Sequence, residues 1–136
     1  MEEKVEIKEV SEREILVGKN KLYFGEDNIL YITVLGDVND EISMKIKEVS
    51  DKFTAMVEGK LNLLVDLNKT GIPSADARKK GLEGFEGEKI GKIAFFGLHP
   101  VARVIASFIM GITKKEDIRF FKTREEALAW LKGEDS

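Results

Sequence analysis

The chain has 136 residues, of which 43% are hydrophobic and 35% charged, and its formal net charge is −3. This length and composition describe a single globular domain that can bury a core. The absence of cysteine excludes disulfides, a thiolate nucleophile and cysteine metal sites. Basic and acidic residues are mixed along the chain, which argues against a nucleic-acid binder, because such proteins normally carry a basic excess.

The first residues, MEEKVEIKEVSERE, lack the apolar segment of a signal peptide. The longest strongly apolar run, residues 101–112, is interrupted by Arg103 and is too short to span a bilayer. We therefore expect a cytoplasmic protein with no transmembrane segment. The lack of cysteine fits a reducing compartment.

Residues 1–20 alternate charged side chains with Val and Ile, a pattern that leaves open an N-terminal arm or an edge strand. The domain itself is expected to cover residues 21–133. Its first two runs, KLYFGE (21–26) and ILYITVL (29–35), are rich in β-branched and aromatic residues and predict a hairpin. Apolar residues spaced by three or four from Ile42 to Val57 then predict one face of an amphipathic helix.

The middle of the chain predicts a buried strand followed by a weak helix. Residues 61–67 (LNLLVDL) form a short, mostly apolar run, as expected of a parallel strand covered on both faces. Ser74 is the expected N-cap of the next helix. That helix has few apolar residues, and the glycines at 81, 84, 87 and 91 predict a mobile connector over 81–91. Their spacing lacks the turn of a dinucleotide fingerprint.

The last third of the chain carries the clearest local signals. Residues 90–96 predict a strand, Pro100 opens an apolar helix that runs to residue 112, and residues 118–121 predict another strand. Thr123 and Glu126 form a capping box at the start of the final helix. The order β-β-α-β-α-β-α-β-α predicts an α/β domain with a mixed sheet of about five strands and helices packed on it.

Three segments carry a family resemblance: KIAFFG leading into HPVARVIASFI, and then IRFFKTREEALAWL. With these motifs the chain resembles the SpoIIAA-like family of the STAS superfamily, which is related in architecture to CRAL-TRIO lipid-binding domains. The pattern F-x-T-x-E-E-A-L-x-W-L is its most specific part, and the match covers roughly residues 22–132. The resemblance implies a mixed sheet covered by helices and no defined reaction.

The resemblance also bears on phosphorylation. In the anti-sigma antagonists of the wider superfamily, a phosphorylated serine lies in an Asp-Ser-Ser-Gly motif at a helix start. The corresponding segment here is Ile-Pro-Ser-Ala-Asp (72–76), so the motif is not intact. The phosphorylated position falls near Ala75, and Ser74 beside it is the candidate for phosphorylation.

Four polar residues are candidates for binding a ligand or an anion: Asp66, Ser74, His99 and Arg103. Asp66 lies near the carboxyl end of a strand, where α/β sheets bind ligands. His99 and Arg103 flank a helix start whose free N–H groups could hold an anion. Each also has a plainer interpretation as a local cap or a solvated side chain. A lone His without Cys builds no typical zinc site, and no motif indicates a cofactor.

Three functions remain open from the sequence. The first is a non-enzymatic STAS-like interaction or regulatory module that binds a protein partner or forms a homo-oligomer, such as a dimer, through Phe108, Ile109 and Ile112. The second is a carrier of an apolar small molecule or lipid, held between the sheet and the glycine-rich segment. The third, ranked last, is a hydrolase-like enzyme that uses Asp66, Ser74 and His99.

Overall fold

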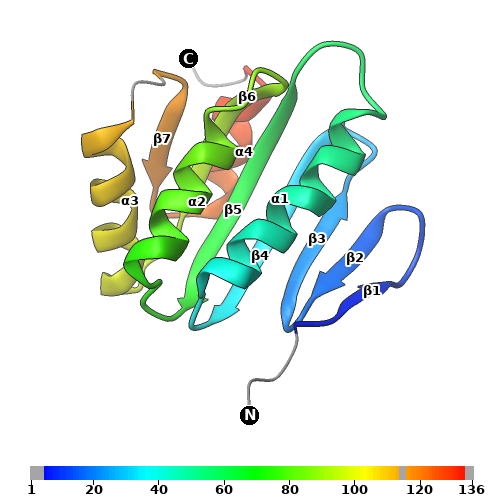
Figure 1. The fold of residues 1–136 in the computed structure, drawn as a ribbon. Coiled ribbons are helices and arrows are strands. Elements are labelled where there is room, and N and C mark those ends of the chain that lie inside the picture. The colour runs from blue at the N-terminus through cyan, green and yellow to red at the C-terminus, as the bar shows by residue number, and fades with distance from the viewer. Residues whose placement is uncertain (1–4, 114–115, 134–136) are drawn as a thin grey trace.

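The computed structural model describes residues 5–113 and 116–133, apart from the side chains of Leu82 and Ile112. Seven strands form one sheet whose spatial order follows the chain from β1 to β7 (Figure 1). The strands are β1 (Ile7–Glu9), β2 (Glu14–Val17), β3 (Asn20–Phe24), β4 (Ile29–Gly36), β5 (Leu61–Thr70), β6 (Ile90–Phe96) and β7 (Ile118–Phe121). The pairs from β1 to β4 are antiparallel, and those from β4 to β7 are parallel.

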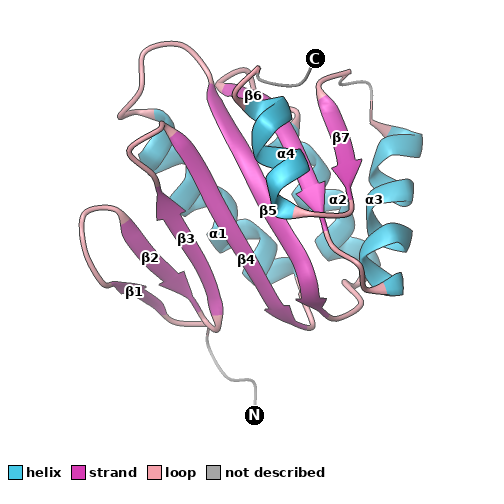
Figure 2. Ribbon diagram, turned by 180° about the vertical axis from the view of Figure 1, so that it is seen from behind, coloured by secondary structure: helices cyan, strands magenta, loops and turns pink. Residues whose placement is uncertain are grey.

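Four helices cover the sheet in two unequal layers. They are α1 (Asp40–Thr54), α2 (Ala75–Phe85), α3 (Pro100–Ile112) and α4 (Arg124–Leu131). The first three lie on one face and α4 alone lies on the other (Figures 1 and 2). Crossovers between parallel strands are right-handed, so helices that connect strands advancing in one direction share one face. The last helix, α4, follows the last strand and connects no pair of strands, so the handedness rule does not determine which face it covers.

Alternation along the central strand β4 divides its side chains between the two layers. Leu30 and Ile32 belong to the larger core beneath α1, α2 and α3. Ile29 belongs to the smaller core beneath α4, where the side chain of Tyr31 packs at the edge. This period of two is the geometry of a pleated strand, and it places one strand in two cores at once.

Side-chain caps are present at the starts of α1 and α4, the second as the sequence predicted. The Asn39 side chain accepts the Ile42 N–H at 2.9 Å at the start of α1. At the start of α4, the Thr123 hydroxyl accepts the Glu126 N–H at 3.3 Å and donates to the Glu126 carboxylate at 3.0 Å. Pro100 occupies the first turn of α3. The mixed α/β sheet predicted from the sequence is confirmed.

The sheet has seven strands instead of about five, because residues near the N-terminus form β1 and β2. Asn20, which is buried, joins this addition to the rest of the sheet. Its amide donates to the Val17 carbonyl at 3.1 Å, and its carbonyl accepts the Leu35 N–H at 2.8 Å. One polar side chain therefore links β2, β3 and β4, which a pattern of apolar residues does not reveal.

Two predicted helix boundaries were wrong. The first helix ends at Thr54 instead of continuing to Val57. The expected connector over 81–91 is helical up to Phe85, so Gly81 and Gly84 lie inside α2. Tertiary contacts hold this weak helix: the Ser43 hydroxyl of α1 donates to the Ala77 carbonyl at 3.1 Å, and the Phe85 ring packs edge-on against Phe95. No helix among residues 5–113 and 116–133 is both long and apolar enough to cross a membrane.

Replacing Gly81 by Ala should raise the free energy of unfolding by about 0.5–1 kcal/mol, the usual difference between Gly and Ala inside a helix. A methyl group there would meet no atom within 4 Å outside its chain neighbours and the backbone of its own helix, so no packing clash opposes the gain. Urea unfolding followed by circular dichroism measures it. Gly36→Ala is the control and should destabilise, because Gly36 has a φ of 75°. A loss of stability in Gly81→Ala would contradict the helical assignment.

Candidate functional site

Asp66 lies within β5, opposite Phe96 at the end of β6, whereas Ser74 and His99 lie at the starts of α2 and α3. The Asp66 carboxylate accepts the Asn68 backbone N–H at 2.9 Å and its side-chain amide at 3.0 Å. Asn68 in turn accepts the Leu98 N–H at 3.0 Å, which ties the end of β5 to the loop before α3. Asp66 is therefore engaged by a residue of its own strand, in a local side-chain bond.

Ser74 and His99 are also occupied locally. The Ser74 hydroxyl accepts the Ala77 N–H at 3.0 Å at the start of α2. The His99 Nδ1 accepts the Val101 N–H at 3.0 Å and is the N-cap of α3. Arg103 is exposed on the first turns of α3. Each residue therefore fits its interpretation as a local cap or a solvated side chain. These contacts do not form the chain of hydrogen bonds from a nucleophile to a base that a catalytic triad requires.

The described residues hold no group of three or more His, Asp or Glu side chains placed to bind a metal ion. The Asp66 carboxylate accepts the backbone and side-chain N–H groups of Asn68 instead. The geometry at this edge of the sheet therefore stabilises two helix starts and one strand end.

The three interface candidates on α3 lie in different surroundings. Phe108 is 39% exposed, and the Arg78 guanidinium of α2 lies 4.5 Å from the centre of its ring. Ile109 is only 5% exposed and belongs to the core beneath α3, so it is corrected from a surface residue to a core residue. The side chain of Ile112 lies outside the described part of the chain.

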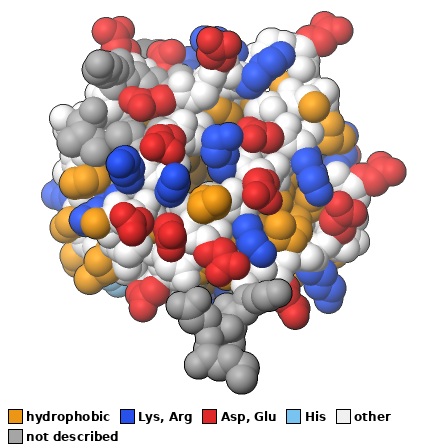
Figure 3. Space-filling view, in the orientation of Figure 1, with side chains coloured by type: hydrophobic (Ala, Val, Ile, Leu, Met, Phe, Trp, Pro, Cys, Tyr) orange, Lys and Arg blue, Asp and Glu red, His pale blue; other side chains and the backbone are white. Residues whose placement is uncertain are grey.

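Beyond Phe108, α3 and the loop before it expose further large apolar side chains, beside the exposed Arg103. Val104 is 67% exposed and Leu98, just before the helix, is 73% exposed; Met110 is exposed as well. Figure 3 shows charged side chains of both signs mixed over α1 and α2, whereas apolar side chains gather at the edge where α3 lies. We call Leu98, Val104, Phe108 and Met110 the α3 surface.

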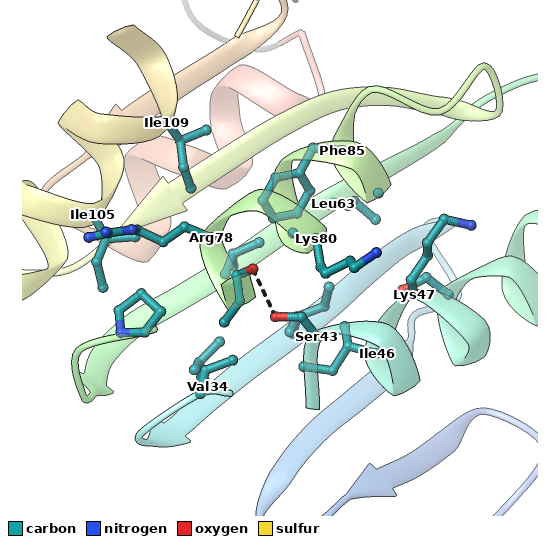
Figure 4. A pocket seen from close by; sticks show the side chains of 18 of the residues that line it. Val34, Ser43, Ile46, Lys47, Leu63, Arg78, Lys80, Phe85, Ile105 and Ile109 are labelled. Carbon is teal, nitrogen blue, oxygen red and sulfur yellow. Dashed lines mark hydrogen bonds between the residues drawn. The ribbon is translucent and has the colours of Figure 1, made fainter. Parts of the chain in front are cut away.

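A cavity of about 120 Å³ lies between the sheet and the helices α1, α2 and α3 (Figure 4). The cavity arises at the inner side of α2, where Ala77, Gly81 and Gly84 line it. These residues have small side chains or none, so they leave unfilled volume between the helix and the strands. Protein interiors normally contain few voids larger than a water molecule, so a cavity of this size is unusual.

Arg78 is the residue at this cavity that the sequence did not single out. Its Nε is buried and has no hydrogen-bond partner among the residues that the structure describes. In the sequence it is followed by Lys79 and Lys80, so it resembles an ordinary solvated side chain. Its spacing of three from Gly81 and seven from Phe85 was the available signal, since those spacings put it on the inner side of the helix.

A second, polar hollow lies on the opposite face, beside α4, and has a volume of about 640 Å³. It exists because α4 packs on β5, β6 and β7 and leaves the back of β3 and β4 uncovered (Figure 2). There the Tyr31 hydroxyl donates to the Asp27 carboxylate, and the Arg124 guanidinium lies 5.2 Å from the centre of the Tyr31 ring. Burial, followed by the bond to Asp27, raises the pKa of Tyr31 to about 12.

Ser74→Ala should lower the free energy of unfolding by about 1 kcal/mol, because it removes the cap of α2. Ser74→Asp should stay close to the wild type, since aspartate caps equally well. Thermal and urea unfolding of both variants measure the difference. An unchanged stability in Ser74→Ala would mean that the hydroxyl has no capping role.

The raised pKa of Tyr31 predicts a loss of stability at alkaline pH. The folded chain holds the phenol proton more tightly than the unfolded chain, whose pKa is near 10.0. The contribution is therefore fully present below pH 10 and is lost as the pH rises towards 12. Urea unfolding between pH 9 and pH 12 should show a smaller decline for Tyr31→Phe than for the wild type.

Tyr23→Phe is the matched control, because Tyr23 lies directly opposite Tyr31 on β3. It leaves the bond between Tyr31 and Asp27 in place and should keep the wild-type decline. If Tyr31→Phe declined as steeply as the wild type, the shift in the pKa of Tyr31 would be absent.

Solved structures share the fold of this chain. One is an uncharacterized protein of the DUF3478 family with a SpoIIAA-like fold from Shewanella loihica PV-4, with a TM-score of 0.63 and 17% identity over 82% of this chain and 91% of that one. Another is the anti-sigma factor antagonist SpoIIAA in its unphosphorylated form, with a TM-score of 0.58 and 14% identity over 86% of this chain and 99% of that one. No curated protein matches the chain.

These similarities confirm the SpoIIAA-like fold that the motifs of the last third predicted. A family model, described as a domain of unknown function, matches residues 23–134, from β3 to beyond the end of α4. That match spans most of the chain, and the protein belongs to this family, DUF7793.

Proposed function

We propose that this chain is a non-enzymatic interaction module that pairs with a second copy of itself through the α3 surface. The observation that carries the proposal is the exposure of large apolar side chains, Leu98, Val104, Phe108 and Met110, on one helix and the loop before it. Apolar side chains gathered on a protein surface commonly mark a contact with a partner.

The charge of this surface favours a second copy over an oppositely charged partner. Among the 13 residues of α3, Arg103 is the only one with a charged side chain. An apolar helix side is complementary to another of the same kind, and a two-fold contact places the same patch on both subunits. The neighbouring α1 and α2 are covered by charges of both signs, which limits the contact to α3 and its surroundings (Figure 3).

A regulatory role through protein contact is supported by the fold. The solved structure of SpoIIAA is named as an anti-sigma factor antagonist, and such a protein acts by binding another protein. At 14% identity the likeness extends to the fold alone, so the role of this chain is our inference from its exposed helix.

Val104→Asp should convert the dimer to a monomer in sedimentation velocity or size-exclusion chromatography with light scattering. The change places two carboxylates in the apolar contact of a two-fold pair. Val104 is 67% exposed, so the folded monomer should tolerate the charge. Phe108→Asp should act in the same direction, although a carboxylate there would lie close to Arg78 and could pair with it.

Met56→Asp is the matched control, because Met56 is 54% exposed and follows α1 at a distance from α3 in the chain. It should keep the wild-type mass. A wild-type chain that stays monomeric up to high micromolar concentration would refute self-association, and so would a Val104→Asp variant that remains a dimer.

A further inference from the structure

The cavity beneath α2 has a mostly apolar wall that three cationic side chains also reach. Ile32, Leu63 and Val65 of the sheet line its floor, and Ile105 and Ile109 of α3 close one side. Figure 4 shows Leu63, Ile105 and Ile109 among the lining side chains, together with the Phe85 ring. A cavity of this kind favours the hydrocarbon part of a ligand, because water inside it would find few polar partners.

Three cations reach the cavity wall, and two of them have carboxylate partners. Lys47 pairs with Asp51 at 3.0 Å, and Lys80 pairs with Glu83 at 3.9 Å. Both of these side chains lie towards α1 in Figure 4. Arg78 reaches the other way, towards α3.

Arg78 has no ion pair among the described residues. Its guanidinium lies against the Phe108 ring, and its buried Nε has no hydrogen-bond partner there. Arginine stays protonated at every accessible pH, so its charge is present at the cavity wall. A buried donor without a partner costs free energy, and a carboxylate supplies the charge and the acceptor that Arg78 lacks.

The volume limits the size of the ligand. A cavity of about 150 Å³ accommodates benzene, so one of about 120 Å³ fits a chain or ring of about six carbon atoms. A long fatty acid does not fit within it. Within the carrier of an apolar small molecule or lipid expected from the sequence, the enclosed volume therefore favours the small molecule.

We propose that the cavity binds a small amphipathic carboxylate, with its apolar part beneath α2 and its carboxylate at Arg78. The site touches the α3 surface only through Arg78, whose guanidinium lies against the Phe108 ring, and Val104 is not among the residues that line the cavity. Arg78 is the determinant of specificity for an anion over a neutral molecule of the same length.

Hexanoate and 1-hexanol are matched probes, since they share a chain length and differ in the charged group. Titrations of the full chain followed by ¹H–¹⁵N correlation spectra should show hexanoate bound at least tenfold more tightly than hexanol. The largest shifts should fall on residues of α2 and on the facing parts of β4 and β5. Equal affinity for the two probes, or no binding of hexanoate, would overturn the proposal.

Two kinds of variant test the site itself. Arg78→Met should abolish the preference for hexanoate, whereas Lys79→Met, an equal loss of charge at an exposed neighbour outside the cavity wall, should preserve it. Ala77→Leu should fill the cavity and abolish binding of both probes. Ser50→Leu, on the facing side of α1, is a second blocking variant in case Ala77→Leu does not fold.

Retained hexanoate binding in a folded blocking variant would place the probe elsewhere and overturn the site. Val104→Asp separates this proposal from the pairing of α3, because it alters the outer surface and leaves the cavity wall intact. That variant should bind hexanoate as the wild type does, whatever its oligomeric state. A loss of binding there would contradict the independence of the two sites.

Discussion

The handedness of the crossovers determines where three of the four helices lie. Strands β4 to β7 advance in one direction across the sheet, and a right-handed connection each time puts α1, α2 and α3 on the same face. The other face receives only α4, which follows the last strand. The two hollows of the molecule both follow from this division, one beneath the crowded layer and one beside the single helix.

Among the three helices on the crowded face, α2 has the lowest intrinsic helix stability. It carries two internal glycines and few apolar residues, and contacts from α1 and the Phe85 ring hold it in place. The same small residues that weaken the helix create the cavity beneath it. Low helix propensity and unfilled volume therefore have one origin, and Arg78 lies on this helix between the cavity and the Phe108 ring.

The sequence predicted the fold best where local signals coincide. The segment from Pro100 to Leu131 has a proline at a helix start, a short aromatic strand and a capping box, and the structure has all three. The N-terminal strands were underestimated because residues 7–17 are half charged, as edge strands commonly are. The extent of α2 was missed because tertiary contacts override its glycines, and helix propensity carries no record of such contacts.

The site was harder to predict than the fold, for a physical reason. Asp66, Ser74 and His99 are polar residues at strand and helix ends, which is where caps and ligand sites both occur. Sequence position cannot separate these two roles, whereas hydrogen-bond partners can, and they assign all three to local caps or side-chain bonds. Arg78 is the reverse case, a residue that the sequence did not single out and the structure does. Its buried Nε without a hydrogen-bond partner is recognised only once α2 is placed over the sheet.

The sheet order has a further consequence for the way the protein is made. Each strand pairs only with the strands just before and just after it in the chain. During synthesis from the N-terminus, every new strand therefore emerges beside a partner that already exists. The antiparallel ribbon from β1 to β4 can form on the ribosome, and each later strand adds to its growing edge. No strand has to wait, unpaired and open to aggregation, for a distant segment.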